Sequence, residues 1–207
     1  MKTPAEFDDI RPYEPEEVQQ VLNELIEDRQ FSHIIKGFAP WMPKSIRNGL
    51  LRLACIGVKT PLDFQKRFML PVMHYLIRKC TTKCTFGGHP LPDKEGRFTY
   101  ISNHRDIVLD SAILDVKLFE SKYPTTVEIA IGDNLLIYPW IKKLVRLNKA
   151  FTVRRGLSPR ELLQSSMLMS RYMHFAVNEK QENIWIAQRE GRAKDSNDRT
   201  QESVLKM

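Results

Sequence analysis

The chain has 207 residues, of which 42% are hydrophobic and 28% are charged, with 9 glycines and 12 prolines. These fractions are typical of a folded globular protein and exclude a collagen-like, repeat or disordered chain. The length predicts one main domain with room for an N-terminal extension. Lysine and arginine exceed aspartate and glutamate by seven charges. This surplus favours anionic partners, whether lipid headgroups, phosphorylated metabolites or nucleic acid.

The cysteines predict neither a disulfide framework nor a metal site. The three cysteines are Cys55, Cys80 and Cys84; no pair has Cys-x-x-Cys spacing, and no histidine stands near them at zinc-finger distances. We therefore expect reduced thiols in a cytoplasmic setting. The N-terminus is acidic, unlike a secretory signal, and no apolar run approaches the roughly 18 residues that cross a bilayer.

Residues 1–80 predict a helical region. A helix begins at Pro15, where proline loses no hydrogen bond, and two further helices are expected over 45–56 and 63–80. Each carries apolar residues beside lysines and arginines. Such faces either lie on a membrane surface with anionic lipids or pack on the rest of the fold, and the pattern leaves both interpretations open.

Residues 81–207 predict an α/β core: a mixed, largely parallel sheet flanked by helices. Strands and helices alternate here, and this order is typical of βαβ units. One helix is expected over 107–119, and Ser158 and Glu161 form a capping box that begins another. The strand candidates are 83–86, 97–101, 125–131, 150–153 and 183–187.

The first polar cluster follows the strand at 97–101. His104 is the best candidate for a general base, because imidazole titrates nearest neutral pH. Asp110 and Asp106 are the candidate partners that would fix its tautomer. Asp106 stands at the expected helix start, where capping is the simpler role, so we favour Asp110, provided that His104 lies in the preceding loop.

Two further clusters follow the strands at 150–153 and 183–187. Arg154 and Arg155 offer forked donors to a phosphate, or form a solvated surface pair. Near Glu190, charged residues surround Gly191, which allows close backbone approach. The chain has no nucleophile elbow, phosphate loop or dinucleotide fingerprint, and no recognisable nucleic-acid module.

In this order the motifs resemble those of the glycerolipid acyltransferase superfamily, which contains glycerol-3-phosphate and 1-acylglycerol-3-phosphate acyltransferases. The matching residues are Asn103, His104 and Asp110 in the first motif, Phe151, Arg154 and Arg155 in the second, and Glu190, Gly191, Arg192 and Lys194 in the third. Five residues separate His104 from Asp110 where four are usual, as in the hemolysin-like branch. Gln188 and Arg189 replace the usual Phe-Pro. The family continues beyond the third motif, so the core is expected to be shortened.

The resemblance implies an acyltransferase of phospholipid biosynthesis. His104 would deprotonate an acceptor hydroxyl, which attacks the thioester of acyl-CoA or an acyl-carrier protein, and Asp110 would orient His104. Arg154, with Arg155 in reserve, would hold the acceptor phosphate. Asn103, Glu190, Gly191, Arg192 and Lys194 would complete substrate binding.

The resemblance also implies a peripheral protein on the cytoplasmic face of a membrane, with no metal or redox cofactor and no nucleic-acid partner. Two alternatives stay open. One is a lipid-surface protein that keeps the fold without catalysis, and the other is an N-acyl or O-acyl transferase that acts on an amino-lipid.

Overall fold

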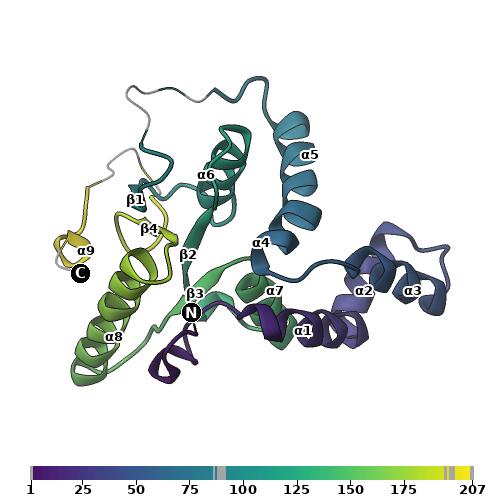
Figure 1. The fold of residues 1–207 in the computed structure, drawn as a ribbon, viewed down its shortest axis with the longest axis horizontal. Coiled ribbons are helices and arrows are strands. Elements are labelled where there is room, and N and C mark those ends of the chain that lie inside the picture. Colours follow the sequence, from purple (N-terminus) through teal and green to yellow (C-terminus); the bar gives the residue numbers. More distant parts are fainter. Residues whose placement is uncertain (1, 86, 88–91, 194, 196–198, 206–207) are drawn as a thin grey trace.

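The computed structural model describes residues 2–85, 87, 92–193, 195 and 199–205. Its centre is a sheet of four parallel strands in the order β1-β4-β2-β3 (Figure 1). The strands are β1 (Thr99–Ser102), β2 (Val127–Gly132), β3 (Ala150–Val153) and β4 (Asn183–Ala187). The predicted α/β class is confirmed, and so are four of the five predicted strands.

The strand predicted at 83–86 is wrong over its described part. Residues 83–85 follow a helix without joining the sheet, and Phe86 lies outside the described residues. β-forming side chains stabilise a strand mainly through neighbours on a paired strand. Within the described residues, no strand pairs with this run.

Helices cover both faces of the sheet. The long helix α8 (Pro159–Asn178) packs on one face, with Phe151 and Ile184 among the core residues. On the other face α6 (Leu109–Glu120) and α7 (Pro139–Leu147) cover Ala150 and Trp185 (Figure 1). Successive strand residues point to opposite faces, so a doubly covered sheet requires continuous apolar runs such as 184–186.

The N-terminal part is helical, as predicted. In chain order its elements are η1 (Ala5–Phe7), α1 (Pro15–Glu27), α2 (Arg29–Phe38), α3 (Lys44–Cys55), α4 (Pro61–Phe64), the π-helical turn η2 (Gln65–Met69) and α5 (Leu70–Cys80). Two short elements, η3 (Asp133–Leu135) and α9 (Glu202–Leu205), complete the fold. Helices α2 and α7 were not predicted from the sequence, although Asp28 caps α2 and Pro139 begins α7.

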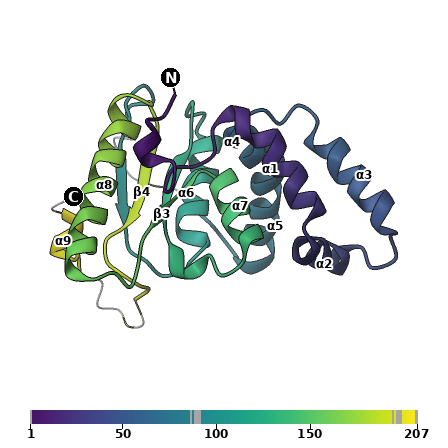
Figure 2. The ribbon, with the colours of Figure 1, turned by 90° about the horizontal axis from the view of Figure 1, so that it is seen from below.

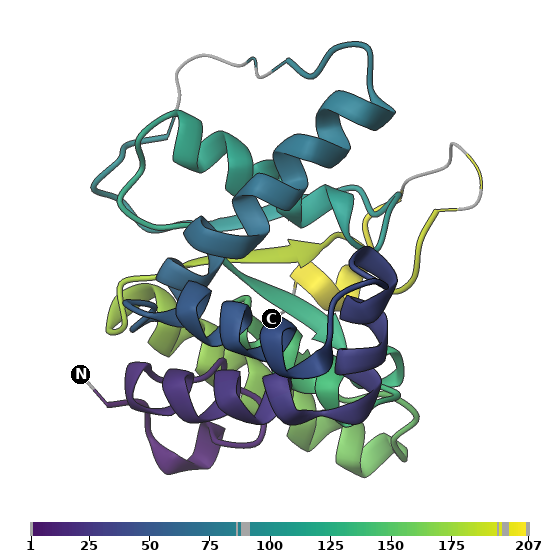
Figure 3. The ribbon, with the colours of Figure 1, turned by 90° about the vertical axis from the view of Figure 1, so that its right-hand side faces the viewer.

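The N-terminal segment is attached to the sheet. The amide of Thr152 in β3 donates to the carbonyl of Ile10 over 2.9 Å. Helix α1 packs on α7 through a shared cluster that includes Leu22 and Leu147. Helices α2 and α3 lie beyond α1, at the end of the molecule farthest from α8 (Figure 2). Seen from that end, the N-terminal helices lie in front of the sheet (Figure 3). Among the described residues, no helix is both long and apolar enough to span a bilayer.

Candidate active site

A cavity of about 480 Å³ lies at the carboxyl ends of the strands. In a parallel sheet these ends share one edge, and ligands of open α/β sheets bind there. The loop after β1 contributes His104, the end of β2 contributes Gly132 and Asn134, and the segment after β3 contributes Arg155. From the end of β4 onward, the lining residues are Ala187, Arg189, Glu190, Gly191 and Arg192.

His104 lies in the loop between β1 and α6 and contacts Asp110 in the first turn of α6. Its Nδ1 is 3.0 Å from Asp110 Oδ2, and both side chains are mostly buried. Oδ2 also accepts the backbone amides of Arg105 and Asp106, at 2.8 and 3.0 Å. A carboxylate at Nδ1 selects the tautomer with its proton on that atom, which leaves Nε2 as the basic nitrogen.

Asp106 caps the same helix. Its Oδ1 accepts the backbone amides of Val108 and Leu109, each at 2.8 Å. The pKa of Asp106 is lowered by the Leu109 amide first, then by the Val108 amide and the charge of Arg192. The two acids of this motif therefore make different contacts: Asp110 holds the imidazole and Asp106 the helix N-terminus.

The loop after β4 is fixed to the loop after β1. Trp185 Nε1 donates to Ser102 Oγ over 3.0 Å, and the indole meets the His104 ring edge to face, with centroids 6.1 Å apart. The amide of Ala193 donates to the carbonyl of His104 over 2.8 Å. These contacts hold the third motif against the imidazole.

The two adjacent arginines after β3 diverge. Arg155 lines the cavity, its amide donates to Asp133 Oδ1 over 3.0 Å, and its guanidinium lies 2.7 Å from Glu190. Arg154 instead pairs with Asp9 over 3.1 Å and is not among the described residues that line the cavity. Successive residues of an extended segment point to opposite sides, so Arg154 lies on the side of β3 beside which the N-terminal segment with Asp9 runs. We predicted Arg154 as the main phosphate ligand with Arg155 in reserve, whereas Arg155 is the one of the two that lines the same cavity as His104.

The third motif lines the cavity at Glu190, Gly191 and Arg192. Gly191 has a φ of +72°, a left-handed conformation that favours glycine. Lys194 lies outside the described residues, and the exposed Asn103 precedes His104 without lining the cavity.

Some lining residues were missed from the sequence. At Gly132 a Cβ atom would lie 2.5 Å from Asn134 Oδ1 and 3.4 Å from Arg155 Nε, so glycine leaves room for both side chains. Arg189, which belongs to the third cluster but not to the predicted site residues, also lines the cavity. The run 132–134 follows a strand as the three recognised clusters do, and this signal could have identified it.

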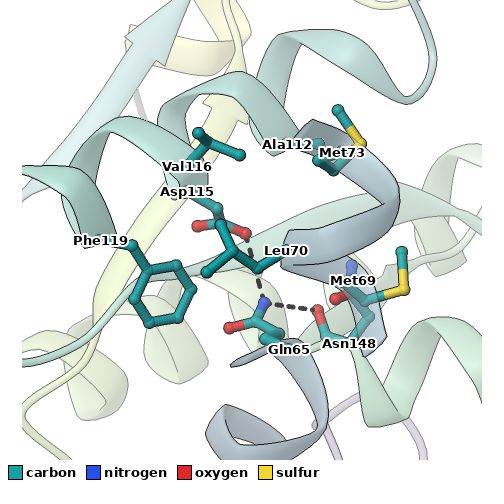
Figure 4. A pocket seen from close by; sticks show the side chains of 9 residues that line it. All are labelled: Gln65, Met69, Leu70, Met73, Ala112, Asp115, Val116, Phe119 and Asn148. Carbon is teal, nitrogen blue, oxygen red and sulfur yellow. Dashed lines mark hydrogen bonds between the residues drawn. The ribbon is translucent and has the colours of Figure 1, made fainter. Parts of the chain in front are cut away.

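A much smaller cavity, of about 20 Å³, lies between α5 and α6 (Figure 4). Its polar wall is Asp115, which accepts the amide of Val127 at 3.0 Å and Gln65 Nε2 at 3.2 Å. Burial raises the pKa of Asp115 to about 7, against the Val127 amide and the charge of Lys149, which lower it. These bonds tie α6 to β2 and to the π-helical turn, a structural role. In the described part of the chain, no cluster of acidic, histidine or cysteine residues has metal-binding geometry.

The fold and this site define an α/β protein with a histidine–aspartate pair beside an arginine-lined cavity. Comparison with protein families matches the Acyltransferase family over residues 83–203, which include every residue that lines the large cavity beside His104. The chain therefore belongs to the Acyltransferase family, and its general activity is acyl transfer. A search of curated proteins finds no match.

Proposed function

We propose that the protein transfers a fatty acyl group from an acyl thioester, acyl-CoA or acyl-carrier protein, to a hydroxyl of a glycerol-phosphate or lysophospholipid. The observation that carries this proposal is the contact of His104 with Asp110 in a cavity that holds three arginines. A base and an anion site in one cavity suit an acceptor that has both a hydroxyl and a phosphate.

His104 Nε2 takes the proton of the acceptor hydroxyl while the hydroxyl oxygen forms a bond to the thioester carbonyl carbon. The carbon–sulfur bond then breaks, the leaving thiolate takes this proton from the imidazolium, and the products are an ester and a thiol. Asp110 stabilises the imidazolium between these steps. A positioned base of this kind is worth about 10² to 10⁴ in rate.

Arg155 is our candidate for holding the acceptor phosphate, because its guanidinium lines the cavity. Arg189 and Arg192 add positive charge, and Glu190 is the one carboxylate among the described lining residues. Arginine forks match phosphate oxygens, whereas a cationic amino-lipid would be repelled. The charge of the cavity thus favours a phosphate acceptor over the amino-lipid alternative.

A panel of acceptors tests this proposal. Release of free thiol from acyl-CoA is followed with glycerol 3-phosphate, lysophosphatidic acid or an amino-lipid, and the products are identified by mass spectrometry. We expect release to depend on a phosphate acceptor and to yield its ester. Transfer to the amino-lipid alone would contradict the proposed acceptor, and vesicle binding without release would favour the non-catalytic alternative.

We further propose that the protein works at the surface of a membrane, on its cytoplasmic face. Several large apolar side chains of α2 and α3 are exposed to solvent, among them Phe38 and Leu53. Exposed apolar side chains beside lysines and arginines are typical of helices that lie in a membrane interface.

A further inference from the structure

A second basic cavity lies between α2 and the start of α3, in a different part of the molecule from His104. Its volume is about 470 Å³. None of its described lining residues is acidic. Five of them are lysine, arginine or histidine: Arg29, His33, Lys36, Lys44 and Arg47. Those from α2 recur at helical spacing, so one face of that helix is directed at the cavity.

Arg47 is the buried member of this set. It is 6% exposed, its Nη2 donates to Ser32 Oγ over 2.8 Å, and its buried Nε has no hydrogen-bond partner among the described atoms. No described carboxylate forms an ion pair with it. A buried guanidinium without a counter-charge is costly, and an anion in the cavity would remove that cost.

The N-terminus of α3 opens on the same cavity. Pro43 and Lys44 line it, and no side chain caps the helix there. The first amides of a helix and its dipole favour an anion at this end. The helix end and the buried guanidinium of Arg47 thus both favour a negatively charged ligand.

The outer surface of the same two helices indicates where the anion comes from. On α3, Ile46, Leu50 and Leu53 share one face and are 54%, 50% and 61% exposed, whereas Arg47 points inward. Phe38, the last residue of α2, and Trp41, in the loop before α3, are 84% and 79% exposed. A helix in water normally shows the reverse arrangement. Apolar side chains next to a cationic cavity match a lipid surface, with hydrocarbon contacts beside headgroup phosphates.

We propose that the cavity between α2 and α3 binds the headgroup phosphate of an anionic phospholipid, with Arg47 as its central ligand. The inference deepens the membrane attachment proposed above and rests on it. It adds a defined phosphate site, separate from the acceptor site near His104, that would hold the protein at an anionic surface.

Vesicle binding of two charge-matched double variants tests the site. Lys36→Gln with Lys44→Gln removes two exposed cations of the cavity, and the control Lys122→Gln with Arg160→Gln removes two exposed cations away from α2 and α3. The vesicles are phosphatidylcholine alone, or phosphatidylcholine with phosphatidylglycerol. We expect wild-type binding to require phosphatidylglycerol. The cavity variant should lose about 25-fold in affinity, whereas the control should lose less than about threefold.

Two outcomes would overturn the proposal. Equal losses in the two double variants would indicate attraction by net charge without a site. Tight binding of inorganic phosphate in solution, with vesicle binding unchanged in the cavity variant, would assign the cavity to a soluble phosphate. Arg47→Lys keeps the charge but removes the guanidinium fork, so it should weaken vesicle binding too, with thermal unfolding followed as a check on folding.

The same variants separate this proposal from the proposed catalysis. With a short-chain acyl-CoA and a dissolved acceptor, the cavity variant should keep wild-type kcat because the substrates no longer come from a membrane. His104→Ala should bind vesicles as wild type does. Loss of transfer in the cavity variant with these dissolved substrates would contradict a purely membrane-binding role.

Discussion

Replacing Asp110 by asparagine isolates the charge that faces His104. An asparagine oxygen can still accept the backbone amides of Arg105 and Asp106, which now donate to Oδ2. The loop should therefore stay in place while the negative charge 3.0 Å from Nδ1 is lost. The change should thus act on the imidazolium and leave the fold intact.

The magnitude follows from the attraction between two unit charges. At about 4 Å and an effective dielectric constant of about 20 this attraction is about 4 kcal/mol, which corresponds to roughly a thousandfold in rate. A neutral imidazole, as in the bound ground state, gains little from this attraction, whereas the imidazolium formed during the reaction gains all of it. The substitution should therefore lower kcat by about 10³ and change KM for the acceptor little. The assay is initial-rate thiol release at saturating acyl-CoA.

Asp106→Ala is the matched control, since this acid lies four residues before Asp110, in the loop that leads into α6, and accepts the amides of Val108 and Leu109 instead of contacting the imidazole. It should lower the free energy of unfolding by about 1 kcal/mol through the lost cap and leave kcat within a few-fold. Our assignment fails if Asp110→Asn keeps more than about a third of wild-type kcat, or if Asp106→Ala loses as much activity as Asp110→Asn.

Three further predictions concern the cavity walls and the buried acid. Arg155→Gln should raise KM for a phosphate acceptor at least tenfold, about the value of one charge-assisted bond, whereas Arg154→Gln should not; equal effects in steady-state kinetics would place the phosphate elsewhere. Gly191→Ala should lower the free energy of unfolding by about 1–2 kcal/mol, because a residue with a Cβ atom is strained at the φ of +72° that Gly191 adopts. An unchanged denaturant midpoint would contradict this. The pKa of Asp115, about 7 when folded against an ordinary 3.8, means that the unfolded chain ionises first. As the pH rises from about 4 to 7, the free energy of unfolding of the wild type should therefore fall, relative to that of Asp115→Asn, by on the order of 1.4 kcal/mol per pH unit. Denaturant titrations across this pH range measure the difference.

The elements predictable from sequence are those with strong local signals. The runs at 150–153 and 183–187 are strands as expected, and the capping box at Ser158 does begin α8. In these places patterning, propensity and capping all agree. Helix α2 was missed because Gly37 and the prolines beyond it obscure a helix that depends on packing against α1.

The site was predictable in its chemistry but not in its geometry. The residues after β1, β3 and β4 reach one edge, as the carboxyl ends of parallel strands must. Their order across the sheet is set by packing on both faces, so the close approach of Gly132 and Arg155 could not be predicted from the sequence. Nor could it distinguish the neighbouring arginines, because their ion-pair partners, Asp9 for Arg154 and Glu190 for Arg155, come from distant parts of the chain.

His104→Ala provides the most direct test of the central claim, measured as acyl ester formed per enzyme with product identification by mass spectrometry. Without the imidazole the rate should fall by at least about 10², while thermal unfolding and vesicle binding stay at wild-type values. Ester formation at an undiminished rate in a folded His104→Ala protein would contradict the proposed reaction.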